Sequence, residues 1–193
     1  MTWPNKKPGL PFSGHGWLNE ENKRTLSTLM PVGAHTIVEV GTWMGLSAHY
    51  MLDMRPQANL YAIDTWEGSI EHHAEPTWAT MLPELWEQFL VDCWEYQDRI
   101  QICRGNSSDM IRRLSYLQPD LVYLDGGHAY EVVSEDIRAI RESWPGVLLV
   151  GDDWGWPGVR QAATESFGEE IYVDGNCWWT TARHHRALGD QRI

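Results

Sequence analysis

The stretch TIVEVGTWMGLS, residues 36–47, decides the fold. Its first five residues are mostly apolar and β-branched, which predicts a short buried strand. LSAHYMLDM, residues 46–54, predicts a helix, and Gly41 and Gly45 lie between the strand and this helix. Glycine lets the backbone turn tightly and approach a ligand closely. We therefore expect a strand–turn–helix unit of a parallel sheet, with a ligand at the turn.

The same alternation of strand and helix continues along most of the chain. Strand patterns occur at 36–40, 59–64, 99–105, 119–125, 146–153, 170–174 and 177–182. The strands are continuous apolar runs, which is typical of strands buried on both faces. A helix is expected over 130–144, with Val132, Ile137, Ile140 and Trp144 on its apolar face. The pattern predicts a single α/β domain over 1–193: a Rossmann-like, doubly wound, mostly parallel seven-stranded sheet with helices on both faces.

Two segments depart from this alternation. Residues 1–30 begin as an arm rich in Pro, Gly and Asn and end in a helix near 20–30, and the sequence HGW at 15–17 is a candidate flap. Residues 67–82 precede a helix that opens near Pro83. A long loop at the ligand end of a sheet is a natural lid, and a surface insertion without a role is the alternative.

The composition of the chain excludes several classes of partner. The 193 residues carry a formal net charge of −12. An acidic surface repels phosphate backbones and anionic membranes, so we expect neither nucleic acid nor a membrane as partner. Cys93, Cys103 and Cys177 have no metal-binding spacing. With a polar N-terminus and no apolar stretch of membrane length, they indicate a cytoplasmic protein with reduced thiols. Whether the chain forms a homo-oligomer stays open.

Aromatic and histidine side chains gather near the expected loops. The tryptophans in or beside these loops are Trp43, Trp66, Trp154 and Trp156. Together they are expected to wall a dry pocket that accepts a flat ligand, although ordinary packing is the alternative for each one. The histidine pairs His72/His73 and His184/His185 have no ligand spacing with other donors and are expected on the solvated surface.

The residues around the first turn point to a nucleoside ligand. Glu39 lies two residues before Gly41, and Asp64 closes the next strand, where an acid can accept both ribose hydroxyls. The third glycine of the nicotinamide fingerprint is missing. The pattern E-x-G-x-x-x-G-x-S, which runs from Glu39 through Gly41 and Gly45 to Ser47, followed by a strand that ends in Asp, resembles the class I S-adenosylmethionine-dependent methyltransferases. The similar branches are the catechol-type and macrocin-type O-methyltransferases, which use a divalent metal.

This resemblance covers residues from about 35 to about 165 and implies cofactor contacts. Glu39 and the backbone near Gly41 would hold the methionine part, and Asp64 would hold the ribose. Gly45, Ser47 and Asp125 are also expected to bind the cofactor. The sequence RGNSSDM, 104–110, resembles the loop that borders the adenine in the catechol-type enzymes, so Ser107 and Ser108 are implied as adenine contacts. Either serine can instead cap a helix.

A second group of acidic residues follows the next two strands. Asp125 ends one expected strand, and Asp152 and Asp153 end the following one. Successive strands are often neighbours, so these carboxylates are expected to converge and to hold a divalent cation such as Mg²⁺. The macrocin-type enzymes resemble this chain in using Asp and Asp-Asp. Without a metal, Asp153 would cap the next turn and Asp152 would bind backbone amides.

A general base is expected at His128. The resemblance places a lysine here in the catechol-type enzymes, whereas the aspartate of the macrocin type corresponds to Gly127, which cannot serve. An imidazole titrates near neutral pH and can take a hydroxyl proton; capping the next helix is the alternative for His128. We therefore expect an S-adenosylmethionine-dependent methyltransferase, with magnesium-assisted O-methylation of a small acceptor through an aromatic or sugar hydroxyl. A metal-independent methyltransferase of small molecules or proteins, or a non-catalytic S-adenosylmethionine-binding module, is the alternative.

Overall fold

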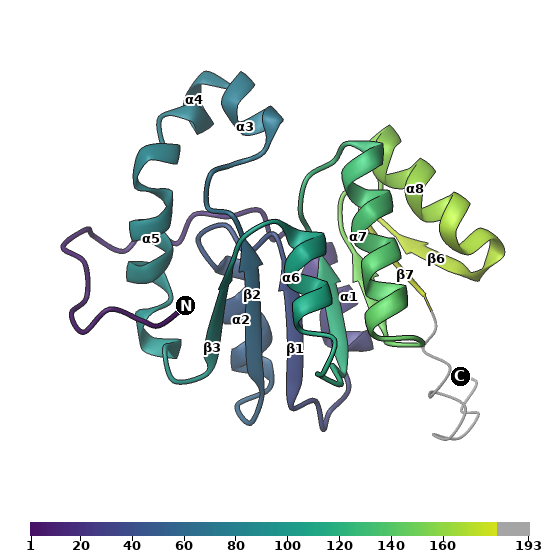
Figure 1. The fold of residues 1–193 in the computed structure, drawn as a ribbon, viewed down its shortest axis with the longest axis horizontal. Coiled ribbons are helices and arrows are strands. Elements are labelled where there is room, and N and C mark those ends of the chain that lie inside the picture. Colours follow the sequence, from purple (N-terminus) through teal and green to yellow (C-terminus); the bar gives the residue numbers. More distant parts are fainter. Residues whose placement is uncertain (181–193) are drawn as a thin grey trace.

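The computed structural model describes residues 1–180, which contain a seven-stranded sheet (Figure 1). The strands are β1 Thr36–Val40, β2 Asn59–Asp64, β3 Ile100–Arg104, β4 Leu121–Leu124, β5 Leu149–Gly151, β6 Ile171–Asp174 and β7 Cys177–Thr180. Their order is β3-β2-β1-β4-β5-β7-β6, and β7 is antiparallel to both of its neighbours while the other pairs are parallel. The expected fold class is confirmed. The end of the strand expected at 177–182, and the pair His184/His185, lie outside the described residues.

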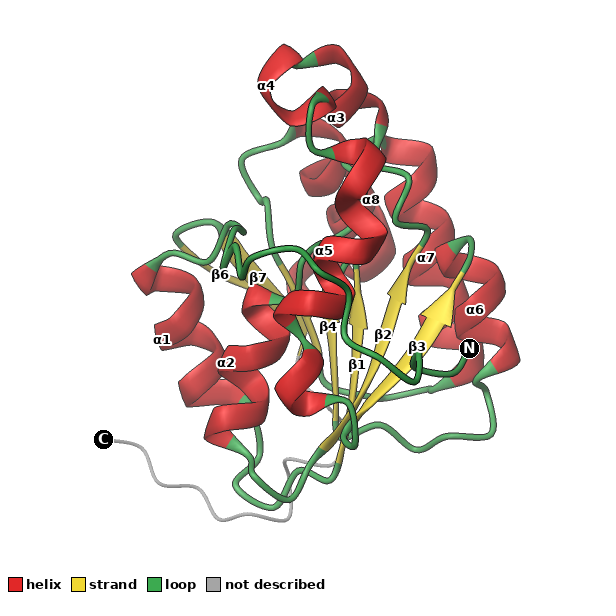
Figure 2. Ribbon diagram, turned by 90° about the vertical axis from the view of Figure 1, so that its left-hand side faces the viewer, coloured by secondary structure: helices red, strands yellow, loops and turns green. Residues whose placement is uncertain are grey.

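Helices cover both faces of this sheet (Figures 1 and 2). The α-helices are α1 Glu20–Leu29, α2 Leu46–Met54, α3 Ile70–Ala74, α4 Pro76–Ala79, α5 Leu85–Asp92, α6 Ser107–Arg113, α7 Tyr130–Ser143 and α8 Pro157–Phe167. Short 3₁₀ turns follow at Leu82–Glu84, Trp94–Tyr96 and Gly168–Glu170. One core contains Ile37 with side chains of α1, α2 and α5, and the other contains Val38 with side chains of α6, α7 and α8. Neighbouring residues of one strand thus bury against opposite helix layers, as the pleat requires.

Helix α7 presents a different face to the core from the one expected. Val132 is 42% exposed, whereas Val133 is buried with Ile137, Ile140 and Trp144. The buried positions 133, 137, 140 and 144 follow the spacing of one helical face, and position 132 falls outside it. Val132 instead borders the cavity described below.

Residues 67–82 are more ordered than the loop expected there. They contain α3 and α4, and both helices stand above the rest of the fold (Figure 1). The first helix begins with a capping box, in which the backbone N–H of Ser69 donates to Nδ1 of His72 at 3.0 Å. The segment is therefore built from short capped helices rather than from an irregular loop.

The N-terminal arm is tied to the far edge of the sheet and to α5. The amino terminus of Met1 donates to the carbonyl of Ile102 at 2.9 Å, and Nε1 of Trp3 donates to the carbonyl of Ile100 at 2.9 Å. Further along, the backbone N–H groups of Ser13 and Gly14 donate to the two carboxylate oxygens of Asp92 at 3.0 and 2.9 Å. These contacts lead the chain toward the cavity.

None of the helices within 1–180 has the length and apolar character needed to cross a membrane.

Candidate active site

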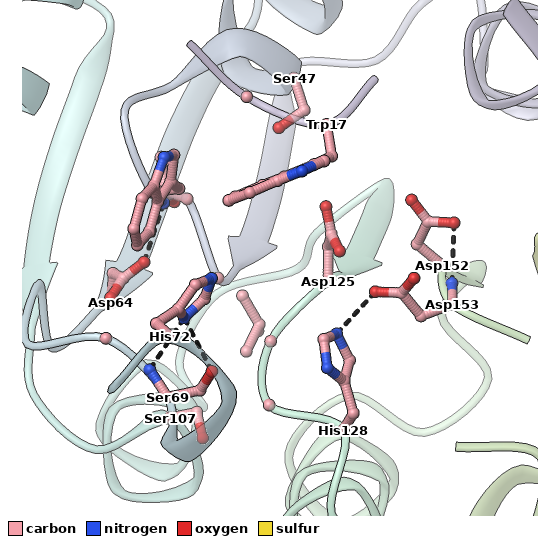
Figure 3. Close-up of a pocket in the computed structure, with 18 of the residues that line it drawn as sticks. Trp17, Ser47, Asp64, Ser69, His72, Ser107, Asp125, His128, Asp152 and Asp153 are labelled. Atoms are coloured by element: carbon pink, nitrogen blue, oxygen red, sulfur yellow. Dashed lines mark hydrogen bonds and ion pairs between the residues drawn. The ribbon is translucent and has the colours of Figure 1, made fainter. Parts of the chain in front are cut away.

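A cavity of about 570 Å³ lies where β1, β2, β4 and β5 end, beneath the helices of 67–82 (Figure 3). A volume of this size suits a cofactor together with a small molecule. The residues expected at the site that line this cavity are Gly41, Ser47, Asp64, Ser107, Asp125, His128, Asp152 and Asp153. Glu39, Gly45 and Ser108 are not among the lining residues. The sheet therefore brings most of the expected residues together and leaves three of them behind the wall.

Gly41 allows the loops after β1 and β4 to pass each other closely. Its φ is +87°, and a Cβ at this position would lie 1.9 Å from the backbone oxygen of Asp125. Only glycine fits both the left-handed backbone and this approach. Next to it, Thr42 is 1% exposed, lines the cavity, and its Oγ1 has no hydrogen-bond partner within 1–180. An orphaned hydroxyl in a cavity wall fits a polar ligand group.

Asp64 is held at the cavity wall by backbone donors. Its Oδ2 accepts the N–H of Trp43 at 2.9 Å, and its Oδ1 accepts the N–H of Trp66 at 2.7 Å. Both tryptophans have left-handed backbones, with φ of 51° and 53°, and this conformation belongs to the turns that hold these two donors. Burial raises the pKa of Asp64. The carboxylate is thus fixed in position before any ligand hydroxyl reaches it.

Glu39 lies beneath the cavity instead of inside it. Its Oε1 accepts the hydroxyl of Ser47 at 2.5 Å, and its Oε2 has no hydrogen-bond partner in the described part of the chain. Complete burial raises the pKa of Glu39 to about 8. The expectation that Glu39 contacts the cofactor directly is not supported by this position. Ser47, which does line the cavity, separates the acid from a ligand.

Gly45 serves the packing of the helices. It caps the N-terminus of α2 with a φ of +93°, and a Cβ there would lie 2.1 Å from Sγ of Cys93, the residue after α5. A glycine is therefore required where these two helices meet. Gly45 does not line the cavity, so this packing role accounts for the glycine, and its cofactor contact stays a prediction.

The loop after β3 also differs from its expected form. Asn106, rather than either serine, caps α6, because its Oδ1 accepts the backbone N–H of Asp109. Ser108 is buried and donates to this same Oδ1 at 3.0 Å. Ser107 lines the cavity and donates to Oδ1 of Asp136 at 2.5 Å. Asn106 and Asp136 also line the cavity, and neither is marked by the spacing of the sequence.

The adjacent aspartates Asp152 and Asp153 have different surroundings. Oδ2 of Asp152 accepts Nδ2 of Asn22 at 2.6 Å and the hydroxyl of Tyr123 at 3.1 Å. Its Oδ1 accepts the backbone N–H of Asp153 at 2.7 Å and Nδ2 of Asn176 at 3.1 Å. A carboxylate has about four acceptor positions. Protein donors therefore occupy Asp152 fully.

This hydrogen bonding does not fit a metal ion held by all three aspartates. Within 1–180 no group of three or more His, Cys, Asp or Glu side chains is arranged to hold a metal ion. Asp125 ends its strand beside Asp152, as expected from the neighbouring β4 and β5. Burial, followed by the charges of Asp152 and Asp153, raises the pKa of Asp125 well above its usual range. Through its hydrogen bonds, Asp152 connects α1, β4 and the loop before β7.

Asp153 turns away from its neighbour and pairs with His128 (Figure 3). Its φ is +61°, and its Oδ2 lies 2.7 Å from Nε2 of His128. Nδ1 of His128 is buried without a hydrogen-bond partner within 1–180 and lies 3.7 Å from Oε1 of Glu71 on α3. Trp156 stacks on the imidazole at a centroid distance of 4.4 Å. Burial lowers the pKa of His128. The hydrogen bond and charge of Asp153, followed by the charge of Glu71, raise it by more, so the pKa lies above its usual value.

Aromatic side chains from distant segments form another wall of the cavity. Trp43 and Trp156 line it as expected, and they are joined by Trp17 of the arm and Trp78 of α4. Trp66 and Trp154 instead pack in or against the two cores. The candidate flap at 15–17 thus reaches the site, whereas Trp78 carries no signal in the sequence beyond its place in the expected lid.

His72 contradicts the expectation of a solvated histidine pair. It lines the cavity, stacks on Trp43 at a centroid distance of 4.5 Å, and has its pKa lowered, chiefly by burial. His73, the next residue, is exposed as expected. On a helix, adjacent residues point in different directions, and only one of the pair faces the cavity.

Comparison with known proteins identifies the family. A family model described as "Methyltransferase domain" matches residues 38–154, and the chain belongs to this family. The family supports S-adenosylmethionine as the cofactor, and the order of strands and helices is that of the class I methyltransferases. A comparison with curated protein sequences gives no match.

Solved structures share the fold at low sequence identity. An O-methyltransferase from Bacillus cereus in complex with SAH has a TM-score of 0.52 and 12% identity, over 82% of this chain and 78% of that one. CalS11, a TDP-rhamnose 3'-O-methyltransferase, has a TM-score of 0.56 and 15% identity, over 85% and 81%. A precorrin 8W decarboxylase from Methanobacterium thermoautotrophicum has a TM-score of 0.60 and 15% identity, over 86% and 92%. Likeness at this identity shows the fold alone, because one fold hosts several reactions.

Proposed function

We propose that this methyltransferase acts on oxygen: it methylates a hydroxyl of a small acceptor, with His128 as the general base. The observation that carries the proposal is the different surroundings of the two ring nitrogens of His128. The Asp153 carboxylate can only accept, so Nε2 of His128 carries a proton, and in the neutral imidazole this leaves the Nδ1 lone pair free. Nδ1 has no partner among the described residues, and His128 lines the cavity.

Each residue around His128 has a defined part in the proposed reaction. Nδ1 takes the proton of the acceptor hydroxyl, and loss of the O–H bond makes the oxygen a nucleophile. Asp153 at Nε2 and Glu71 near Nδ1 stabilise the imidazolium that forms. S-adenosylmethionine, when bound, would supply an electrophilic methyl group on its sulfonium sulfur, with the neutral thioether S-adenosylhomocysteine as the leaving group. The tryptophans of the cavity wall exclude water and hold a flat or sugar-like acceptor at the distance that reaction requires.

Magnesium assistance stays a prediction. Because Asp152 is fully hydrogen-bonded by protein donors, we derive no step through a metal. Asp125 and Asp153 retain acceptor positions that an ion with bound waters would use. A metal-independent reaction of the same fold agrees better with the donors around Asp152.

The first experiment is calorimetric titration of S-adenosylhomocysteine into the protein, once with Mg²⁺ and once with EDTA. Micromolar affinity is expected in both. The second is transfer of labelled methyl groups from S-adenosylmethionine to phenols, catechols and sugars under the same two conditions. Turnover that survives EDTA supports the metal-independent route, and turnover only with Mg²⁺ contradicts it. Cofactor binding without turnover on any hydroxylated acceptor contradicts O-methylation.

A further inference from the structure

Glu71 brings a carboxylate from the segment 67–82 to the end of the cavity that holds His128. It belongs to α3, lines the cavity, and its side chain is 23% exposed. In Figure 3, His128 and Asp153 lie on one side of the cavity and Asp64 lies on the other. Glu71 therefore belongs to the side away from the expected ribose contact. The reaction proposed above uses only its charge, although a carboxylate also has about four acceptor positions for hydrogen bonds.

The Glu71 carboxylate and Nδ1 of His128 are two neighbouring acceptors with no hydrogen bond between them. Oε1 of Glu71 lies 3.7 Å from Nδ1, and Nδ1 is buried without a hydrogen-bond partner within 1–180. A hydroxyl has a single proton, so a hydroxyl that donates to Nδ1 cannot also donate to Glu71. A ligand that binds both acceptors therefore needs a second donor next to its hydroxyl.

The charge at this end of the cavity favours a cation as the second donor. Burial raises the pKa of Glu71. Hydrogen bonds to its own backbone N–H and to Ser69, followed by the charge of His128, lower this pKa by more, so the group is ionised at pH 7. No Lys or Arg side chain of residues 1–180 lines the cavity. An ammonium group would thus form a charge-assisted hydrogen bond with Glu71 without competition from a protein cation.

Aromatic rings next to Glu71 suit the same cation. Trp17 and Trp78 each lie at a centroid distance of 5.6 Å from the ring of His72, the residue that follows Glu71. All three rings line the cavity. Because aromatic faces attract cations, this wall favours an ammonium group more than a carboxylate or a phosphate.

We infer that the acceptor is a vicinal amino alcohol, such as an amino sugar, whose protonated amine binds Glu71 while the neighbouring hydroxyl donates to Nδ1 of His128. The inference rests on the proposed function and names its substrate class. In the gauche conformation, the nitrogen and oxygen of such a pair lie about one hydrogen-bond length apart. This spacing suits two acceptors that are 3.7 Å apart.

The ammonium group also directs the methyl group to oxygen. A protonated amine has no lone pair to accept a methyl group, and the negative charge of Glu71 stabilises this protonated form. The hydroxyl proton passes to Nδ1 of His128, and the oxygen takes the methyl group as its bond to the sulfonium sulfur breaks. The ammonium group is unchanged, and its charge stabilises the negative charge that develops on the neighbouring oxygen.

The test is an NMR titration of three ring compounds into the protein saturated with S-adenosylhomocysteine, at pH 7. They are trans-2-aminocyclohexanol, trans-cyclohexane-1,2-diol, which has no charge, and cyclohexylamine, which has no hydroxyl. The wild-type protein is expected to bind the amino alcohol about 5- to 30-fold more tightly than the diol, the lower range for a hydrogen bond to a charged group because Glu71 is partly exposed. Cyclohexylamine is expected to bind about fivefold more weakly than the amino alcohol, because it leaves Nδ1 without a donor.

A pair of variants connects this preference to Glu71. In Glu71→Gln the preference for the amino alcohol over the diol is expected to fall below about twofold, because the side chain keeps its shape and loses its charge. Glu67→Gln is the matched control: Glu67 is an exposed residue of the same segment, and its replacement changes the net charge equally. The control is expected to keep the wild-type preference, which separates Glu71 from the general attraction of an acidic protein for cations.

The inference is overturned if the wild-type protein fails to bind the amino alcohol, or binds the diol or cyclohexylamine as tightly. It is also overturned if Glu71→Gln, folded by thermal melting, keeps the preference. Selective binding through Glu71 without transfer of a labelled methyl group to the amino alcohol would keep the amine site and reject the proposed reaction. Failure of S-adenosylhomocysteine to bind would reject the proposed cofactor site, and the inference with it.

Discussion

The two ends of the cavity are built in different ways. At the cofactor end, Asp64 is the last residue of β2 and Ser107 is the first residue of α6, and neighbouring loop and helix residues fix them. At the acceptor end, His128 meets Asp153 from another loop and Glu71 from the segment 67–82. Tertiary contacts hold both ends, but the second end also depends on Glu71 from the helical segment 67–82, which lies outside the regular alternation of strands and helices. A fold can therefore keep one end while the other changes.

Replacing His128 should give the largest effect and should separate the two ends. Loss of a general base typically lowers the rate by about 10²- to 10⁴-fold. We expect His128→Gln to lose kcat in this range while the Kd for S-adenosylhomocysteine stays within about twofold. Steady-state kinetics and calorimetry measure the two quantities. His73→Gln, at an exposed position of the same short helix as His72, is the control and should retain activity. A parallel loss of cofactor affinity would contradict the division of the cavity.

Gly41→Ala should damage both ends at once, because Gly41 lies where the loops of β1 and β4 touch. The added Cβ would meet the backbone oxygen of Asp125, which cannot move aside like a side chain, and the left-handed φ adds strain. Such strain costs about 1–3 kcal/mol and the clash adds to it, so we expect a loss of about 3 kcal/mol in the free energy of unfolding. Urea unfolding measures it. Gly33→Ala is the control, since no atom lies within 4 Å of its Cβ. Equal stability of the two variants would contradict the close approach.

Residues that line the cavity were predictable from the sequence at both ends, but the partners that hold them in place were not. A buried strand followed by glycines and a helix places Gly41, Ser47 and Asp64 at one rim, because local pattern fixes all three. Strand periodicity alone does not show that Glu39 lies beneath the cavity wall, where its Oε1 accepts the hydroxyl of Ser47. The pairing of Asp152 with Asn22 joins residues 130 positions apart, and no local spacing reveals it.

Glu39 provides a test that is confined to the cofactor end. Burial raises the pKa of this carboxyl from 4.5 to about 8, so between these values the native state keeps a proton that the unfolded chain has released. Stability should therefore fall as the pH rises across this window, by up to about 1.4 kcal/mol per pH unit from this group. Glu39→Gln cannot ionise and should lose that part of the decline. Urea unfolding between pH 5 and 8 compares the slopes, with the exposed Glu95→Gln as control. Parallel slopes for Glu39→Gln and the wild type would contradict the raised pKa.

The smallest effect is expected at the acceptor end, from loosening the arm. Asp92 accepts the N–H groups of Ser13 and Gly14 and so guides Trp17 to the cavity. In Asp92→Asn one of these donors faces an amide N–H₂ group, and we expect the KM for the acceptor to rise about three- to tenfold at constant kcat. The exposed Asp98→Asn is the matched control. Because the arm contributes a wall and no reacting group, a fall in kcat larger than the rise in KM would mean that the arm also positions His128.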